Sequence, residues 1–150
     1  MTTYATRPII EDTPAQPRPT SKGRLAVKIL TTTDHKMIGY LYLATSFAWF
    51  LIGGILALLI RAELARPGMQ FFSSEQYNQI FTMHGTIMVF FLFTAVLTGG
   101  FGNFLIPLQI GARDMAFPFL NALSYWVFLV SCIVITSALF ITSGAPLGGW

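Results

Sequence analysis

A histidine stands inside an apolar stretch of this 150-residue sequence, in FTMHGTIMVFF at positions 81–91. Ionisable side chains are rare within membrane-spanning segments and are usually functional there. Imidazole is a common metal ligand, including an axial ligand of haem iron, so His84 is a candidate ligand. A hydrogen bond to another helix explains the same residue equally well. Either way, the polar ring nitrogens need a partner in an apolar setting.

Arg61 follows an uncharged stretch, residues 38–60. Its guanidinium group could neutralise a cofactor propionate or donate to a cofactor carbonyl. An interfacial arginine that extends to lipid headgroups is the simpler interpretation of the position alone.

A carboxylate precedes the last apolar stretch, in GGFGNFLIPLQIGARDMAFPFLN at positions 99–121. Asp114 could collect protons there, while the neutral groups of Asn103, Asn121 and Ser124 order water without trapping a proton as a buried charge. The alternative is that Asp114 caps the following helix and pairs with Arg113.

The elements that position these residues follow from the distribution of charge. Only 10% of the residues are charged, against about 25% in ordinary soluble domains. Residues 38–60, 76–112 and 115–150 contain no Asp, Glu, Lys or Arg, and a bilayer needs roughly 20 helical residues. The sequence therefore predicts an all-α integral membrane bundle. Its three transmembrane helices are expected at residues 37–60, 78–105 and 120–142.

The basic residues predict the orientation. Six of the nine Lys and Arg residues lie in residues 1–36, which read as a polar cytoplasmic tail, disordered or lying on a surface. The loops 61–77 and 143–150 are then outside, and the loop 106–119 is inside. This flank accounts for the net charge of +3, so nucleic acid is not an expected partner. The single cysteine cannot form an internal disulfide.

Several motifs in one order resemble subunit I of the haem–copper respiratory oxidases, of the cytochrome c oxidase type. They are TTDHKMIGYLYL (32–43), LLIRAELARPG (58–68), YNQIFTMHGTIMVFFLF (77–93), GGFGNFLIPLQIGARDMAFPFLNALSYW (99–126) and GGW (148–150). The resemblance covers nearly everything after the tail. It implies the N-terminal part of a subunit with about twelve helices, of which three are present here.

The resemblance also implies roles for individual residues. His84 resembles an axial ligand of the low-spin haem A, Arg61 the donor to the haem formyl group, and Trp150 a residue near the haem propionates. Asp114 resembles the mouth of a proton pathway. Further polar residues of that pathway are matched by Asn103, Asn121, Ser124 and Tyr42, and a peripheral cation site is matched by Glu63 and Gly68.

As a whole, the resemblance implies a proton-pumping terminal oxidase, an oxidoreductase and translocase of the inner or plasma membrane. Electrons from cytochrome c would pass through low-spin haem A to a haem–copper centre that reduces O2 to water. The high-spin haem, the copper and the second haem ligand are expected from the remainder of the subunit. No catalytic residue is expected in this segment, and the 150-residue piece alone is not expected to be active.

Expected partners are the rest of subunit I, subunits II and III, cytochrome c or a cytochrome bc complex, O2 and the lipid bilayer.

Two other functions stay open. Phe119 stands where many cytochrome c oxidases have arginine and, with PLQIGARD, it also resembles the quinol oxidase branch of the superfamily. GFGN and the polar tail favour the cytochrome c branch. A non-haem subunit that translocates protons or ions would use Asp114 and His84 as relay groups, and it would show no visible absorption.

Overall fold

The computed structural model describes residues 22–141 and divides the chain into two units, which end and begin between Leu30 and Thr31. In the first unit, the described residues form one helix, α1 (Lys22–Leu30). Part of the predicted polar tail is therefore helical. Residues 1–21 and 142–150 lie outside the described part, and with them the predicted loop 143–150 and Trp150.

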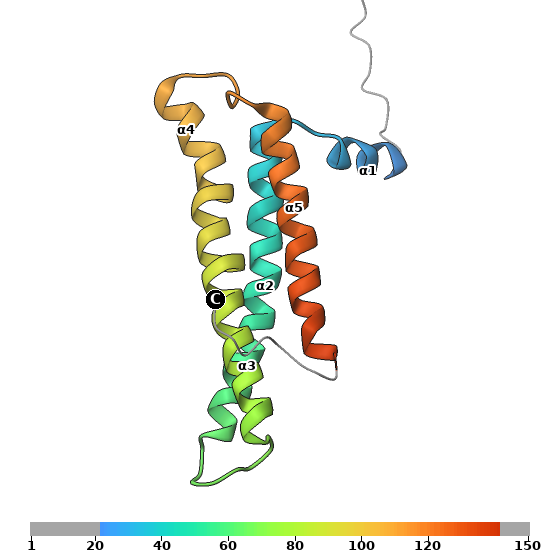
Figure 1. Cartoon of the computed structure of the whole chain (residues 1–150). Helices are drawn as coiled ribbons and strands as arrows, with labels where there is room; N and C mark the ends of the chain where they lie inside the picture. The colour runs from blue at the N-terminus through green and yellow to red at the C-terminus, as the bar shows by residue number, and fades with distance from the viewer. Residues whose placement is uncertain (1–21, 142–150) are drawn as a thin grey trace, which may run out of the picture. The chain divides into compact units, whose positions relative to one another are not determined.

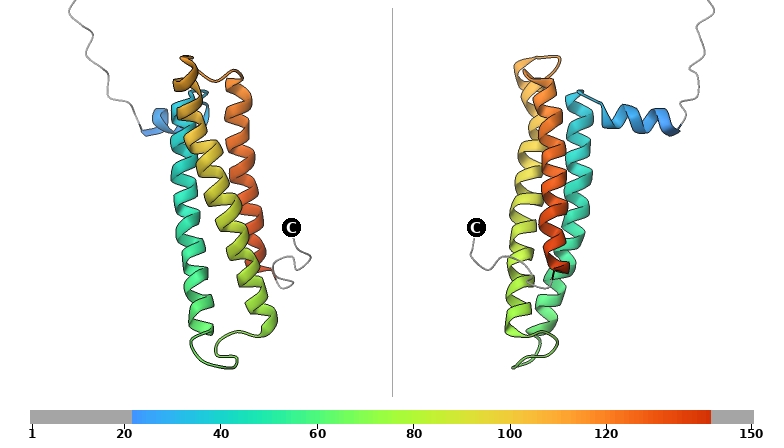
Figure 2. Two further views of the ribbon diagram at one scale, coloured as in Figure 1. Left: turned by 90° about the vertical axis from the view of Figure 1, so that its left-hand side faces the viewer. Right: turned by 45° about the vertical axis from the view of Figure 1, so that its right-hand side comes forward.

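The second unit contains three long helices that run side by side (Figures 1 and 2). The first is α2 (His35–Glu63). The second runs from Ser74 to Ile110 and the third from Pro118 to Phe140. All three are long and apolar enough to cross a membrane, and no strand occurs in residues 22–141. The predicted all-α membrane bundle is confirmed.

The second and third long helices are composite. The second consists of α3 (Ser74–Thr86), the π-helix η1 (Ile87–Phe101) and α4 (Gly102–Ile110). The third consists of α5 (Pro118–Ser137) and the 3-10 turn η2 (Ala138–Phe140).

Each long helix begins at a local sequence signal and not at the edge of a charge-free stretch. The Asp34 side chain accepts a hydrogen bond from the backbone N–H of Lys36 at 3.0 Å and caps α2. Ser73 and Gln76 form a reciprocal capping box at the start of α3. Pro118 occupies the first position of α5, where its missing N–H costs nothing. The helices therefore start two to four residues before the predicted positions 37, 78 and 120.

The π-helix η1 keeps one face of the second long helix against α2. Its buried residues recur at every fourth position, and the stripe continues into α3 and α4. In an α-helix with 3.6 residues per turn, every fourth residue drifts by about 40° around the axis. The wider π turns, with i→i+5 hydrogen bonds, offset that drift. The stripe comprises Met83, Ile87, Phe91, Ala95, Gly99, Asn103 and Pro107.

Contacts on this stripe and next to it bring α2 and the second long helix close together. Phe104 packs against Gly39, and a Cβ built on that glycine would lie 2.6 Å from the Phe104 ring. Three hydrogen bonds also join α2 to α5, in ascending order along both helices. They are Tyr42–Ser124 at 2.9 Å, Thr45–Tyr125 at 2.9 Å and Trp49–Thr136 at 3.0 Å. The ascending order shows that α2 and α5 are parallel.

Candidate functional site

Two groups of polar residues lie at different levels of the three-helix bundle. We call the end where α2 begins the His35 end and the end where α2 finishes the Glu63 end. His84, on α3, lies between them and contacts the middle of α2. Its Nδ1 atom is 2.9 Å from the carbonyl oxygen of Gly53.

This contact fixes the tautomer of His84. A carbonyl oxygen can only accept, so Nδ1–H is the donor and the lone pair of the neutral ring lies on Nε2. Metal-ligating histidines usually donate their other ring N–H to a carboxylate, a carbonyl or water in this way. Within residues 22–141, Nε2 has no hydrogen-bond partner. Both interpretations of His84 are thus compatible: the ring is hydrogen-bonded to another helix and still has one nitrogen for a metal.

The absence of a side chain at Gly53 lets the histidine reach this carbonyl. A Cβ at this position would lie 2.9 Å from Met88 Sδ and 3.1 Å from Ile87 Cγ2, so a larger residue would separate the two helices. Within residues 22–141 there is no group of three or more His, Cys, Asp or Glu side chains that could hold a metal ion. A single imidazole nitrogen such as His84 Nε2 is the kind of donor that haem iron takes from a protein.

Arg61 lies in the last turn of α2, exposed, and forms no ion pair within residues 22–141. It is eight residues beyond Gly53 on the same helix, about 12 Å along the axis. The structure therefore does not bring Arg61 and His84 into contact.

Four of the five residues of the predicted proton pathway form one hydrogen-bonded group near the His35 end. Asn121 Nδ2 donates to Asn103 Oδ1 at 2.6 Å, and Asn103 Nδ2 donates to the Gly99 carbonyl at 2.6 Å. Ser124 Oγ donates to the Asn121 carbonyl at 2.7 Å and is 2.9 Å from the Tyr42 hydroxyl. The group joins α2, the second long helix and α5 through neutral donors and acceptors only.

Asp114, the fifth residue, lies in the loop between α4 and α5 and has other partners. Its Oδ1 atom accepts a hydrogen bond from the backbone N–H of Met115 at 2.7 Å and lies 2.9 Å from His35 Nδ1. The N-cap of α5 is Phe117, and no ion pair joins Asp114 to Arg113 in the described part of the chain. The contacts of Asp114 therefore differ from those of a simple helix cap paired with a neighbouring arginine.

Sequence reasoning gave His35 no role, and the structure places it beside Asp114. His35 is the first residue of α2 and is 6% exposed, and its Nδ1 atom is also 3.8 Å from Asp34 Oδ1. One sequence signal was available: His35 directly follows the residue that caps α2, on the side of the membrane where the predicted topology puts Asp114.

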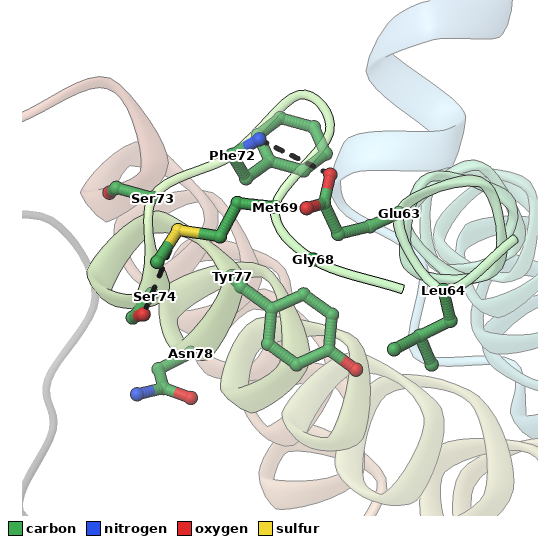
Figure 3. Close-up of a pocket in the computed structure, with 9 residues that line it drawn as sticks. All are labelled: Glu63, Leu64, Gly68, Met69, Phe72, Ser73, Ser74, Tyr77 and Asn78. Atoms are coloured by element: carbon green, nitrogen blue, oxygen red, sulfur yellow. Dashed lines mark hydrogen bonds between the residues drawn. The ribbon is translucent and has the colours of Figure 1, made fainter. Parts of the chain in front are cut away.

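At the Glu63 end, a buried carboxylate holds the loop that follows α2. Glu63 is 6% exposed, and its oxygens accept the backbone N–H groups of Gln70 at 2.7 Å, Phe71 at 2.7 Å and Phe72 at 3.2 Å. Gly68 has a φ of 88°, which favours glycine. Glu63 and Gly68 line one cavity of about 270 Å³ (Figure 3). The peripheral cation site stays a prediction, because the only partners seen for the carboxylate in residues 22–141 are these N–H groups.

Residues 37–150 match the family described as "Cytochrome C and Quinol oxidase polypeptide I". The chain belongs to this family. It is similar to a cytochrome c oxidase subunit 1-beta of Streptomyces coelicolor, with 58% identity over 139 residues that make up 92% of the chain and 24% of that protein. It is also similar to cytochrome c oxidase subunit 1 of Corynebacterium diphtheriae, with 51% identity over 140 residues that make up 91% of the chain and 25% of that protein.

The family match confirms the resemblance to haem–copper oxidase subunit I and agrees with the three long apolar helices. The chain spans about a quarter of the length of the curated relatives it matches. The family's description covers both cytochrome c and quinol oxidases. Membership therefore establishes the kind of subunit and leaves the electron donor to experiment.

Proposed function

We propose that this chain is part of the catalytic subunit of a proton-pumping cytochrome c oxidase in the cell membrane. In the complete complex, cytochrome c would supply electrons through low-spin haem A, and O2 would be reduced to water at a haem–copper centre. The rest of subunit I supplies the second ligand of the low-spin haem, the high-spin haem and the copper. Subunits II and III are the expected neighbours, and the N-terminus is cytoplasmic.

The observation that carries this proposal is the hydrogen bond from His84 Nδ1–H to the Gly53 carbonyl. It directs the lone pair to Nε2, and it limits rotation of the ring, so the nitrogen is oriented before any metal is bound. His84 would be the axial ligand of the low-spin haem. Arg61, with no ion pair within residues 22–141, is available to donate to the haem formyl group. The haem supplies one-electron transfer when it is bound.

Proton uptake is assigned to the His35 end. Asp114 is exposed in the loop and held by His35, so it can exchange protons with water. Beyond it, the group formed by Tyr42, Ser124, Asn121 and Asn103 offers hydroxyl and amide groups that can both donate and accept. Such a group can order water for proton transfer without holding a charge of its own. Because no hydrogen bond joins Asp114 to this group in the described chain, water must connect the two.

The test is a reduced-minus-oxidised visible spectrum of the purified native complex, followed by haem extraction. A low-spin haem A band that is missing in the His84→Ala variant supports the proposal. A complex without haem would instead point to a non-haem subunit that translocates protons or ions. Oxygen uptake with reduced cytochrome c, compared with uptake with a quinol, separates the cytochrome c oxidase from the quinol oxidase of the same family.

A further inference from the structure

A cavity of about 450 Å³ opens at the His35 end, between the start of α2 and the end of α4 with the loop that follows it. Its lining combines two cations, Lys36 and Arg113, with the apolar side chains of Phe104 and Leu108. It is distinct from the contact between His84 and Gly53 and from the hydrogen-bonded group of Tyr42, Ser124, Asn121 and Asn103. The lining also includes His35, the partner of Asp114, but neither the haem ligand nor the proton pathway proposed above uses Lys36, Arg113, Phe104 or Leu108.

Both cations are free to bind an anion. Lys36 and Arg113 are exposed, and neither forms an ion pair within residues 22–141. The two nearby carboxylates have other partners. Asp34 accepts the backbone N–H of Lys36 and lies near His35, and Asp114 is bound to His35 and the backbone of Met115. The rim of the cavity thus carries two cationic side chains that form no ion pair within the described part of the chain.

The apolar wall of the cavity is partly fixed in place. The Phe104 ring packs against Gly39 and makes an edge-on contact with Tyr40, with 5.1 Å between the ring centroids. Leu108, one turn further along α4, is 77% exposed and leaves a hydrophobic surface uncovered by the described chain. An apolar ligand segment could therefore lie along α4 without displacing a packed side chain.

The position along the helices gives the depth of this cavity in a membrane. Lys36 is the second residue of the α2 span, and Arg113 lies in the loop between the other two spans. With these spans in a bilayer, both cations would lie at the level of the lipid headgroups, and Phe104 and Leu108, at the end of a span, would lie next to the acyl chains. Basic pockets between transmembrane helices at this level are suited to anionic lipid headgroups.

We propose that this cavity binds one anionic phospholipid, with its phosphate between Lys36 and Arg113 and an acyl chain along Phe104 and Leu108. The combination of a cationic rim with an uncovered apolar wall matches an amphipathic anion, whereas a free phosphate would use the rim alone. The inference needs the membrane placement of the three helices and not the oxidase activity. It therefore does not depend on the proposed haem and proton chemistry.

The experiment uses the whole oxidase complex, delipidated in detergent and titrated with phosphatidylglycerol or phosphatidylcholine, with bound lipids counted by native mass spectrometry. We expect one phosphatidylglycerol per copy of this chain to be lost in the double variant Lys36→Gln with Arg113→Gln. Removal of two headgroup-level cations should weaken its binding by about 30-fold. The variant with Lys36→Arg and Arg113→Lys keeps both charges and should retain the lipid.

Arg66→Gln is the matched control, because Arg66 is an exposed arginine in the loop at the Glu63 end. It should leave the count of bound lipids at the wild-type value. Equal binding of phosphatidylcholine, or an unchanged count in the double variant, would overturn the proposal. Inorganic phosphate that displaces the lipid at equal concentration would show a plain phosphate site and would also overturn it. The haem spectrum of each preparation is recorded separately, so a failure of the proposed oxidase function is recognised independently.

Discussion

The imidazole of His35 and the carboxylate of Asp114 lie 2.9 Å apart, although 79 positions separate the two residues in the chain. The contact joins the start of α2 to the loop between α4 and α5. It also gives the exposed carboxylate a buried partner that restricts its orientation. The candidate proton acceptor is therefore part of a pair, and each member can be tested separately.

Replacement of His35 by leucine should lower oxygen turnover of the complete enzyme while the haem spectrum stays unchanged. Leucine removes the donor to Asp114 but fills a similar apolar volume. A hydrogen bond to a charged group contributes about 1.5–3 kcal/mol, so we expect a loss of roughly tenfold or more if the orientation of Asp114 governs proton uptake. The measurement is oxygen consumption, with proton uptake followed by a pH-sensitive dye.

His35→Asn is the matched variant for this prediction, because its amide nitrogen can occupy nearly the position of Nδ1. It should restore most of the turnover lost in His35→Leu. Equal defects in both variants would show that His35 acts through packing and would contradict the positioning role.

Asp114→Asn should reduce turnover and proton pumping and leave both haem bands in place. The amide keeps an oxygen that can accept from His35 Nδ1–H, so the geometry of the pair is preserved while the ionisable group is lost. Loss of a proton-transfer group typically costs a factor of about 100 or more in rate. Stopped-flow measurement of proton uptake gives the rate, and an altered low-spin haem spectrum in this variant would count against the assignment.

His84→Ala should remove the low-spin haem, because the variant lacks the proposed ligand atom Nε2. The other histidine of the described chain, His35, lies at the start of α2 and cannot replace it. A visible spectrum of the purified complex and quantitative haem extraction measure the loss. His35→Asn serves as the histidine control and should keep the full haem content. A normal low-spin band in His84→Ala would refute the ligand assignment.

The presence of three helices long and apolar enough to cross a membrane was predictable from the sequence, because charge is excluded from residues 38–60, 76–112 and 115–150. The grouping of Asn103 with Asn121 was predictable too, since a short loop joins the ends of their two helices. The π-helix η1 was not, because a run such as IMVFFLFTAVLTGGF has the same composition as an apolar α-helix. Only its packing against α2 reveals the four-residue repeat.

The contact between His35 and Asp114 was not predictable for a different reason. It depends on the path of the loop after Gly111, which adopts a φ of 67° and ends α4.

Sequence reasoning placed Arg61 and His84 in one outer group, and the structure separates them along α2. The sequence analysis connected Arg61 and His84 through one cofactor that both would contact. The two side chains do not contact each other, so the structure of the chain by itself does not test this connection.

Glu63→Ala should loosen the loop between α2 and α3. The substitution leaves the backbone N–H groups of Gln70, Phe71 and Phe72 without their acceptor, at a cost of about 1–3 kcal/mol for each group that stays buried. Limited chymotrypsin digestion of the intact complex should then cut after Phe71 or Phe72 several-fold faster than in the wild type. Glu75→Gln is the control, since Glu75 is an exposed carboxylate at the same end. An unchanged digestion rate in Glu63→Ala would show that the loop is held by other contacts.

Gly99→Ala should destabilise the bundle at the close approach of η1 and α2. A Cβ at position 99 would meet the Tyr42 ring, which cannot move freely because it packs against Tyr125 and Phe128 with centroids 5.2 Å away in each case. Overpacking of this kind costs about 1–3 kcal/mol, so the thermal unfolding midpoint of the complex should fall. Gly54→Ala is the control, because a Cβ at position 54 meets no atom within 4 Å, and alanine favours the helix by about 1 kcal/mol. Because Tyr42 also contacts Ser124, Gly99→Ala should lower proton uptake as well. An unfolding midpoint of Gly99→Ala at or above that of Gly54→Ala would disprove the close approach of the two helices.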